Sequence, residues 1–151
     1  MLILAGLAGS IKKELKTEDV LCVVSENFAD IGVNKQGFFD PLYNHFEWKE
    51  RYRKGKIINP HLSLITKTNL DKVSSNTVNI CNLGLKSMPV ADIENMEGAS
   101  FFLIAENFKI PYLEIRSISN YAGEKDKNKW KINESLESLS DYLREFLNSR
   151  L

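Results

Sequence analysis

Apolar and polar positions along this chain alternate between short, nearly continuous apolar runs and stretches with helical spacing. The run over 19–25 (DVLCVVS) is β-branched and almost entirely apolar, which is typical of a central strand buried on both faces. Similar short runs bounded by turn residues predict further strands. The predicted strands cover residues 1–5, 19–25, 72–80, 91–96 and 112–119, and the first leads into a glycine turn at 6–10.

Three other segments have the signals of helices. Asn59 followed by Pro60 provides a capping side chain and a proline in the first turn, which predicts a helix over 59–69. A second helix is predicted over 97–108. After a polar loop over 120–133, the last helix buries one face through apolar residues spaced three and four apart, namely Leu136, Leu139, Leu143, Phe146 and Leu147.

Strands that alternate with helices predict an α/β fold, here a three-layer α/β/α sandwich around a central mixed sheet. Residues 26–56 interrupt this pattern with glycines, aromatic residues and a basic run, so we interpret them as an excursion from the sheet. The opening strand has no earlier strand or helix to cover it, and we expect it to lie at an exposed edge. We interpret residues 1–151 as a single domain that is incomplete at its amino terminus.

Composition and charge narrow the range of functions. Twenty Lys and Arg balance twenty Asp and Glu in 151 residues, so we expect no general attraction to nucleic acid or to a membrane surface. Cys22 and Cys81 lie in apolar runs and are interpreted as buried thiols. His45 and His61 are interpreted as loop residues, because no pattern of metal ligands surrounds them. We therefore expect neither a metal ion nor another cofactor.

The apolar start of the chain, residues 1–10, contains small residues that could pass for a secretory cleavage site. No positively charged segment precedes it, and Lys12 and Lys13 follow it instead. It is also too short to span a bilayer. We interpret it as a buried strand and expect the protein to be cytoplasmic.

The densest chemical signal lies where two predicted strands end. Met96 and Glu97 follow one strand, and Ser119 and Asn120 end another. Ligands of α/β sheets bind at the carboxyl ends of strands, where a carboxylate can accept two vicinal sugar hydroxyls. Taken singly, Glu97 also fits a favourable charge in the first turn of a helix, and Asn120 fits a residue that caps a strand. Their combined placement favours a binding site.

Four segments together resemble the purine nucleoside phosphorylase and nucleosidase superfamily: A-G-L-A-G-S, D-V-L-C-V-V-S, N-M-E-G-A and R-S-I-S-N. Within that superfamily, M-E-G-A and S-I-S-N, followed by E-K-D-K-N-K-W over 124–130, most resemble the futalosine hydrolases. The resemblance covers nearly the whole chain. It implies an N-glycosyl hydrolase that releases hypoxanthine or adenine from futalosine or aminodeoxyfutalosine, in the alternative route to menaquinone.

The resemblance also implies roles for individual residues. Met96 and Glu97 would grip the ribosyl hydroxyls, with Asn95 beside them in the same motif. A carboxylate bonded to those hydroxyls helps most when the breaking N-ribosyl bond gives the sugar oxocarbenium character. Ser119 and Asn120 would lie at the same site, at the end of the other strand.

The amide of Asn120 sets the expectation about the base. Relatives that cleave adenine nucleosides have an aspartate here, which accepts hydrogen bonds from the ring N–H and the 6-amino group of the leaving adenine. A hypoxanthine leaving group presents one N–H donor and one 6-oxo acceptor, and these match the acceptor and donor of an amide. Asn120 therefore favours a 6-oxopurine nucleoside as the small-molecule partner.

Other contacts follow from the resemblance, each with an alternative. Ala8 and Gly9 would let the backbone approach the reacting sugar, although a tight turn alone has the same glycines. Thr77, Val78 and Asn79 would line the purine. Phe38, in the patch 37–39, would cover the far end of the sugar across a homodimer interface, and an interface patch without substrate contact fits equally well.

Three arginines are candidates for the benzoate carboxylate of such a substrate: Arg51, Arg53 and Arg116. For Arg51 and Arg53, which belong to a basic run, a solvated charged surface is the simpler interpretation.

The chain departs from the family pattern at its start. Family members carry two opening strands, a helix and a water-activating acid before the glycine turn, and no segment here matches them. Positioned general-base help is worth about two to four decades in rate, so hydrolysis without it is expected to be slow. Two hypotheses stay open: a nucleoside hydrolase, and a non-catalytic or partner-dependent fragment. Phosphorolysis would need a phosphate site, on which these residues are silent.

Overall fold

The computed structural model describes residues 1–35, 38–41, 56–80 and 89–149. Its centre is a sheet in the order β5-β2-β6-β7-β1-β8, with both parallel and antiparallel neighbours. The predicted mixed sheet is therefore confirmed. Its strands are β1 (Leu2–Ser10), β2 (Val20–Phe28), β5 (Lys56–Ile58), β6 (Lys72–Thr77), β7 (Ile93–Asn95) and β8 (Tyr112–Tyr121).

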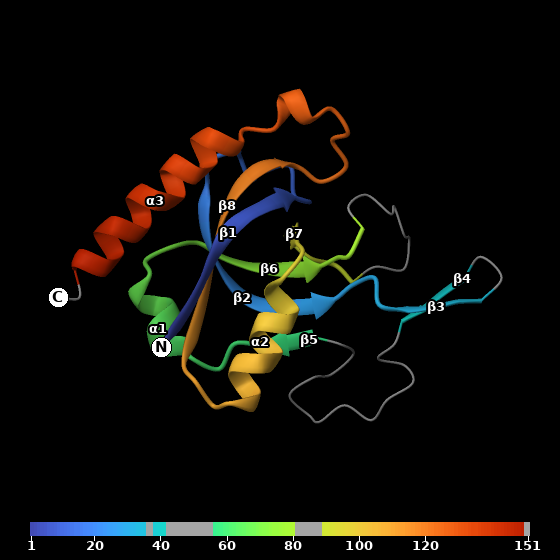
Figure 1. The fold of residues 1–151 in the computed structure, drawn as a ribbon, viewed down its shortest axis with the longest axis horizontal. Coiled ribbons are helices and arrows are strands. Elements are labelled where there is room, and N and C mark those ends of the chain that lie inside the picture. Colours follow the sequence, from blue (N-terminus) through green and yellow to red (C-terminus); the bar gives the residue numbers. More distant parts are fainter. Residues whose placement is uncertain (36–37, 42–55, 81–88, 150–151) are drawn as a thin grey trace.

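The sheet curves so strongly that β8, at one end of the strand order, also pairs with β2 near the other end. Figure 1 shows β1, β8 and β2 crossing one another. β8 runs parallel to β1 along its whole length and antiparallel to the first half of β2. The second half of β2 pairs with β5. This curvature brings the ends of β1, β7 and β8 together on one side of the molecule.

Helices cover both faces of the sheet, as predicted for a three-layer fold. Neighbouring residues of β2 point to opposite faces: Leu21 and Val23 pack in one core cluster, and Cys22 packs in the other. α2 (Gly98–Asn107) covers the first cluster, and α1 (Leu62–Lys67) and α3 (Ile132–Asn148) cover the second. The sheet therefore lies between helical layers.

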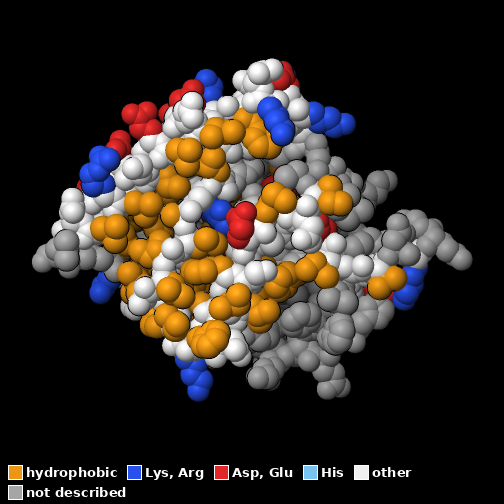
Figure 2. Space-filling model, in the orientation of Figure 1, with side chains coloured by type: hydrophobic (Ala, Val, Ile, Leu, Met, Phe, Trp, Pro, Cys, Tyr) orange, Lys and Arg blue, Asp and Glu red, His pale blue; other side chains and the backbone are white. Residues whose placement is uncertain are grey.

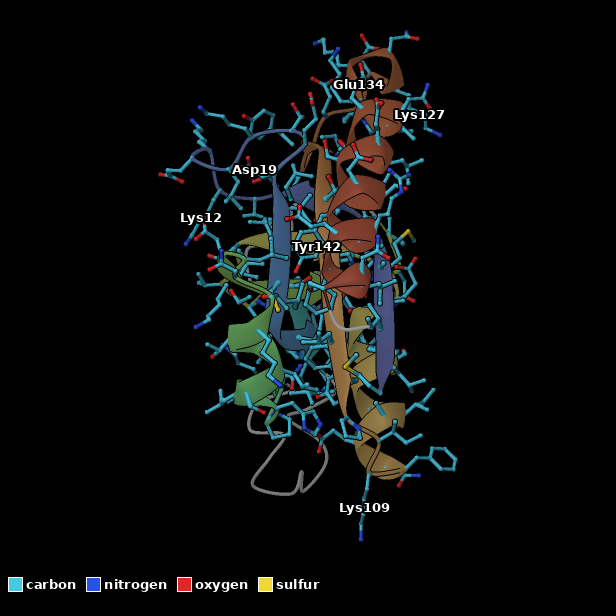
Figure 3. The ribbon with its side chains drawn as sticks, turned by 90° about the vertical axis from the view of Figure 1, so that its left-hand side faces the viewer. Lys12, Asp19, Lys109, Lys127, Glu134 and Tyr142 are labelled. Atoms are coloured by element: carbon cyan, nitrogen blue, oxygen red, sulfur yellow. The ribbon has the colours of Figure 1, made fainter. Side chains whose placement is uncertain are left out.

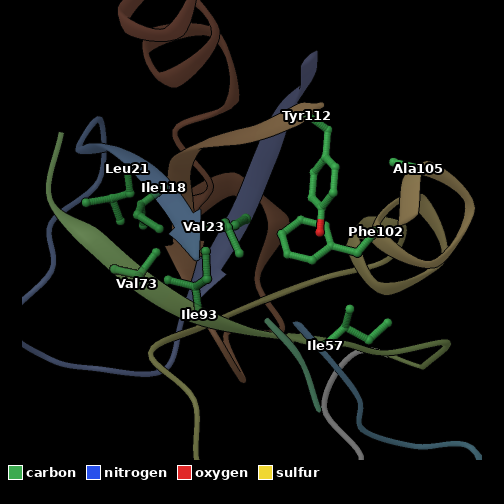
Figure 4. Close-up of a cluster of buried hydrophobic side chains, with 10 residues drawn as sticks. Leu21, Val23, Ile57, Val73, Ile93, Phe102, Ala105, Tyr112 and Ile118 are labelled. Carbon is green, nitrogen blue, oxygen red and sulfur yellow. The ribbon is translucent and has the colours of Figure 1, made fainter. Parts of the chain in front are cut away.

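The first core cluster is built on aromatic packing between α2 and β8 (Figure 4). Phe102 and Tyr112 are fully buried, and their rings meet edge to face with centroids 4.7 Å apart. Truncation of a buried aromatic ring of this kind costs about 3–5 kcal/mol. The second cluster is smaller, and in Figure 3 α3 lies along the sheet with Tyr142 on its inner side. The Tyr142 hydroxyl donates to the Thr68 carbonyl over 2.8 Å, which links α3 to the end of α1.

The predicted glycine turn at 6–10 is wrong, because these residues continue β1 as far as Ser10. β8 pairs with them along their length, with one irregularity between Ala8 and Gly9. The glycines serve close packing instead of a turn. A Cβ on Gly6 would lie 2.5 Å from Nη1 of Arg116.

The other predicted elements exist with shifted ends. β2 extends three residues beyond the predicted end at 25, and α1 is shorter than the helix predicted over 59–69. Within the predicted excursion, β3 (Gly32–Lys35) and β4 (Phe38–Pro41) form a separate two-stranded hairpin. The predicted positions His45, Arg51, Arg53 and Cys81 lie outside the described residues.

Opposite β8, β1 pairs among the described strands only at Gly9 and Ser10, through β7. The rest of that edge, from Leu2 to Ala8, has no neighbouring strand in the described structure. The predicted exposed edge is therefore limited to Leu2–Ala8, because at Gly9 and Ser10 β1 lies between β7 and β8. No helix in the described ranges has the length and apolar composition needed to cross a membrane.

Candidate active site

A cavity of about 420 Å³ opens where β1, β7 and β8 end. Its walls come from the glycine-rich part of β1, from residues 94–97, from the end of β8 and from the loop that leads to α3. Figure 2 shows on this face a hollow in which charged side chains are surrounded by hydrophobic ones. A cavity of this size, mostly apolar with a few polar groups, is typical of a small-molecule site.

Glu97 occupies the N-cap position of α2, and its side chain makes no capping hydrogen bond. Its carboxylate instead accepts from Nη2 of Arg116 over 3.0 Å. The Glu97 side chain is 60% exposed, whereas that of Arg116 is 3% exposed. A buried cation thus holds an accessible carboxylate at the wall of the cavity.

Asn95 fixes the start of α2, where Glu97 leaves the backbone. Its Oδ1 accepts from the backbone N–H groups of Glu97 and Gly98 over 2.8 and 2.7 Å. Its Nδ2 donates to Glu26 and to Ser75. Asn95 lines the cavity, but its amide is engaged within the protein, so its described contacts are those of a positioning residue.

Arg116 itself is set in place by several acceptors. Its Nε donates to Oε1 of Glu114 over 2.7 Å, and its Nη2 donates to Asn95 as well as to Glu97. Its Nη1 donates to the Leu7 carbonyl over 3.3 Å, in the space that Gly6 leaves open. The structure therefore places Arg116 as a buried support of Glu97. The predicted contact with a benzoate carboxylate remains a prediction.

Two buried carboxyl groups lie beneath this arrangement, on Glu26 and Glu114. Both are completely buried, and both have oxygens close to the bare Cα of Gly98. Burial, together with the negative charge of Glu26, raises the pKa of Glu114 to about 8. Burial also raises the pKa of Glu26, against hydrogen bonds from Thr77 and Asn95 that lower it. For Glu114, the charge of Arg116 and its hydrogen bond act in the opposite direction, and they offset the rise in the pKa only in part.

Asn120, near the end of β8, also lines the cavity and is 8% exposed. Its Oδ1 accepts from the Ser119 hydroxyl over 2.8 Å, and its Nδ2 donates to the Tyr121 carbonyl over 3.0 Å. One amide N–H and one lone pair of Oδ1 are left for a ligand after these bonds. The side chain is therefore held in one orientation with one donor and one acceptor available.

The structure brings most of the predicted site residues together. Thr77 and Asn79 do not line the cavity. The Thr77 hydroxyl donates to the buried Glu26, and Asn79 donates to Asp30 on an exposed surface through its backbone N–H and its side-chain amide. Phe38 lies in the separate hairpin, and its side chain is outside the described residues. The predicted residues that do line the cavity are Ala8, Gly9, Val78, Asn95, Met96, Glu97, Ser119 and Asn120.

Sequence reasoning missed three polar or aromatic side chains of the cavity wall: Glu94, Glu124 and Trp130. Trp130 donates through Nε1 to the Glu124 carbonyl over 3.1 Å, and this bond fixes the loop next to a short 3-10 turn at Lys127–Lys129. The alternation of β7 could have indicated Glu94, because its neighbours Ile93 and Asn95 are the buried positions of that strand. Among the described residues, no group of three potential ligands gathers to hold a metal ion.

Comparison with known proteins gives matches at the level of sequence and of structure. The sequence profile of the Phosphorylase superfamily matches residues 1–148. The futalosine hydrolase of Thermus thermophilus is 39% identical over 57 residues, a segment that covers 38% of this chain and 25% of that protein. The chain therefore matches a quarter of the length of this curated relative.

Two solved structures show the same fold across 97% of this chain. The futalosine hydrolase of Helicobacter pylori superimposes with a TM-score of 0.76 at 20% identity, and 67% of that chain is covered. The methylthioadenosine/S-adenosylhomocysteine nucleosidase of Colwellia psychrerythraea, solved in complex with adenine, superimposes with a TM-score of 0.70 at 15% identity, and 65% of that chain is covered. Both contain a substantial part that has no counterpart in the residues compared.

Proposed function

Because the chain belongs to the phosphorylase superfamily, we propose that it hydrolyses the N-ribosidic bond of a purine nucleoside in the cavity at the ends of β1, β7 and β8. One observation supports this most directly. The cavity has an accessible carboxylate, Glu97, held by a buried arginine, and a fixed amide, Asn120, in the same walls. These two groups suit the two halves of a nucleoside.

In this proposal the ribosyl group lies against Glu97. As the bond between C1′ and the purine breaks, positive charge develops on the sugar ring, and a carboxylate bonded to the sugar hydroxyls stabilises that charge more than it stabilises the substrate. Arg116 keeps the carboxylate in place and leaves its outer side open to the cavity. Met96, which is half exposed, offers an apolar surface beside the sugar.

The purine lies against Asn120. The free N–H of Nδ2 donates to a 6-oxo group, and the free lone pair of Oδ1 accepts from a ring N–H. This pairing favours hypoxanthine over adenine as the released base. The side chains of Val78 and Trp130, which also line the cavity, supply apolar surface for the purine.

We infer that the substrate is futalosine, within the alternative route to menaquinone. Aminodeoxyfutalosine carries a 6-amino group in place of the 6-oxo group, so it matches the Asn120 amide less well. The sequence match to the Thermus thermophilus futalosine hydrolase and the E-K-D-K-N-K-W segment that carries Trp130 support this choice over other nucleosides. The cytoplasmic location and the homodimeric or higher oligomeric state remain predictions of the sequence.

A second candidate is a partner-dependent nucleoside-binding chain. The edge of β1 from Leu2 to Ala8 favours it, because no described strand pairs with that edge. An unpaired edge of this kind is a template for a strand from another polypeptide. In this case the cavity would bind a nucleoside, while turnover would need the partner.

Release of the free base from futalosine, followed by chromatography, tests the proposal, with methylthioadenosine as the contrasting substrate. The proposal predicts hypoxanthine from futalosine at a higher kcat/KM than adenine from methylthioadenosine. Release of adenine with equal or higher efficiency would contradict the preference for a 6-oxopurine. No release of base from either nucleoside, together with calorimetric binding of hypoxanthine, would favour the partner-dependent chain.

A further inference from the structure

Among the described residues, two ionisable side chains of the cavity wall are not used by the proposed function, Glu94 and Glu124. Glu124 is paired with Lys129, which leaves Glu94 as the candidate. It is half-buried in β7, between the buried residues Ile93 and Asn95. Its Cα is the sheet partner of the Gly9 Cα. Among the described residues, no hydrogen bond or ion pair engages its carboxyl group, although that group lines the cavity. A half-buried carboxyl without a partner is costly unless a ligand uses it.

Gly9 brings Glu94 and Asn120 to the same place. A Cβ on Gly9 would lie 3.3 Å from Nδ2 of Asn120 and 3.5 Å from Oε1 of Glu94. The absence of that Cβ leaves a recess whose two polar sides are an amide and a carboxyl. The carboxyl thus lies at the end of the cavity to which the proposed function assigns the purine.

The leaving purine needs a proton that Asn120 cannot supply. When the bond between C1′ and N9 breaks, its electron pair passes to the purine, and protonation of the imidazole ring at N7 makes the base a better leaving group. A side-chain amide donates hydrogen bonds but does not release a proton in this pH range. A carboxyl group within reach of the base is a general acid of the required kind.

We propose that Glu94 is the general acid of this site and delivers its carboxyl proton to N7 of the purine as the C1′–N9 bond breaks. This rests on the proposed function. The electron pair of the broken bond stays on the purine, which leaves as the neutral base, and Glu94 becomes a carboxylate. Water adds to C1′, and the proton that this water loses returns to Glu94 through solvent.

The surroundings of Glu94 favour the protonated form that this role requires. Burial raises the pKa of its carboxyl group. The other charged groups lining the cavity in the described structure are Glu97 at the start of α2, Arg116 on β8 and Glu124 in the following loop. Arg116 is paired with Glu97 and Glu114, and Glu124 accepts from the Asp126 N–H and from Lys129. Neither Arg116 nor Lys129 therefore pairs with Glu94 to stabilise its ionised form.

Two substrates with different leaving groups separate acid catalysis from binding. Futalosine releases a base that needs a proton, whereas p-nitrophenyl β-D-ribofuranoside releases a stable anion that does not. We expect Glu94→Gln to lower kcat on futalosine by about 10²–10⁴-fold, with KM little changed and the alkaline limb of the pH profile lost. On the nitrophenyl riboside its rate should fall by less than about threefold.

Two other variants make the comparison specific. Glu97→Gln should lower the rate on both substrates, because its carboxylate acts on the ribosyl group that they share. Glu137→Gln replaces an exposed glutamate of α3 and should change neither rate. A Glu94→Gln variant within about threefold of the natural chain on futalosine would overturn the proposal. So would an equal loss on both substrates, which would indicate a structural or binding role.

If the natural chain releases neither base nor nitrophenol, the proposed function fails, and calorimetric binding of hypoxanthine then decides the role of Glu94. If the Glu94 carboxyl group contacts the purine, the affinity of the natural chain for hypoxanthine should change with pH. The affinity of Glu94→Gln should be constant across the same pH range. Identical pH dependence in both chains would overturn the contact.

Discussion

Asn120 is held by two hydrogen bonds within the protein, from the Ser119 hydroxyl and to the Tyr121 carbonyl, and these fix which end of its amide faces the cavity. A site built to donate to a substrate oxygen discriminates strongly against an analogue that presents a donor there, because one buried polar group is left unpaired. The choice between a 6-oxo and a 6-amino purine is therefore a property of this residue.

Asn120→Asp should move the preference toward adenine nucleosides. The carboxylate accepts from the 6-amino group and cannot donate to a 6-oxo group, so we expect the ratio of kcat/KM for futalosine over methylthioadenosine to fall by at least about tenfold. Steady-state kinetics on both substrates measure this ratio. Asn107→Asp, at an exposed position near the end of α2, is the matched control. An unchanged ratio in Asn120→Asp would contradict the matching of amide and base.

Glu114 links the site to the stability of the fold. Because its pKa in the folded chain is about 8, the folded chain binds more protons than the unfolded chain between about pH 4.3 and 8. The contribution of Glu114 to the free energy of unfolding is therefore fully present below its pKa in the unfolded chain. It is lost as the pH rises through its pKa in the folded chain. The slope reaches about 1.4 kcal/mol per pH unit for one proton.

Glu114→Gln should flatten the pH dependence of stability. The amide oxygen can still accept from Nε of Arg116, while the titrating proton is removed. Urea unfolding between pH 5 and pH 9 should show the natural chain losing stability with rising pH and the variant losing less. Glu137→Gln should follow the natural chain. Equal slopes in Glu114→Gln and the natural chain would show that this carboxyl does not titrate in the folded state.

At the scale of elements, the start of α2 is the part on which the site depends most. The first backbone N–H groups of α2 donate to side-chain oxygens. Those of Glu97 and Gly98 donate to Asn95, and that of Ala99 donates to Thr77. These bonds satisfy donors that a helix end leaves without partners. They also set the direction in which Glu97 leaves the backbone.

Gly98→Ala tests how tightly this end is packed. The added Cβ would collide with Oε1 of Glu26 and lie 2.7 Å from Oε1 of Glu114, both in the buried carboxyl pair. Overpacking of this kind costs about 1–3 kcal/mol, and displacement of α2 should also lower turnover because Glu97 moves with it. Ser100→Ala, at an exposed position of the same turn, is the control for both readouts. Natural stability and turnover in Gly98→Ala would contradict the packing described here.

The elements were largely predictable from the sequence because their apolar patterns are strong. The continuous apolar run of β2 and the spacing of apolar residues in α3 can both be identified directly from side-chain type. The glycine-rich end of β1 was not predictable in this way, since glycine has no side chain to show that a strand continues. Its pairing with β8 comes from a segment about a hundred residues away in the chain.

The candidate site was predictable where a motif carried it, at Met96, Glu97, Ser119 and Asn120. Trp130 was missed because its role depends on which way a loop turns its side chain, and a single sequence does not show this. Glu94 was missed although the alternation of β7 could have indicated it. The supporting pair of Glu26 and Glu114 was also hidden. Glu114 lies in a segment that otherwise looks like an ordinary buried strand, and Glu26 lies directly after the predicted end of β2 at residue 25.

At the scale of the whole molecule, closure of the sheet creates the site. β8 carries Asn120 and Arg116, and it pairs with β1 and β2 at once. β7 ends directly before Met96 and Glu97, and it pairs with β1 at Gly9 and Ser10. An open sheet with the same strands would separate these ends. The curvature seen in Figure 1 is therefore what places a ribose-binding group and a base-binding group in one cavity.

The most direct test of the central claim is a crystal structure with a stable nucleoside analogue that combines an iminoribitol ring with a 9-deazahypoxanthine base. The account predicts that the analogue lies in the cavity with its ribosyl-type hydroxyls on the Glu97 carboxylate and its 6-oxo group on the Asn120 amide. An analogue bound with its base at Glu97, bound outside the cavity, or not bound at all would contradict the account.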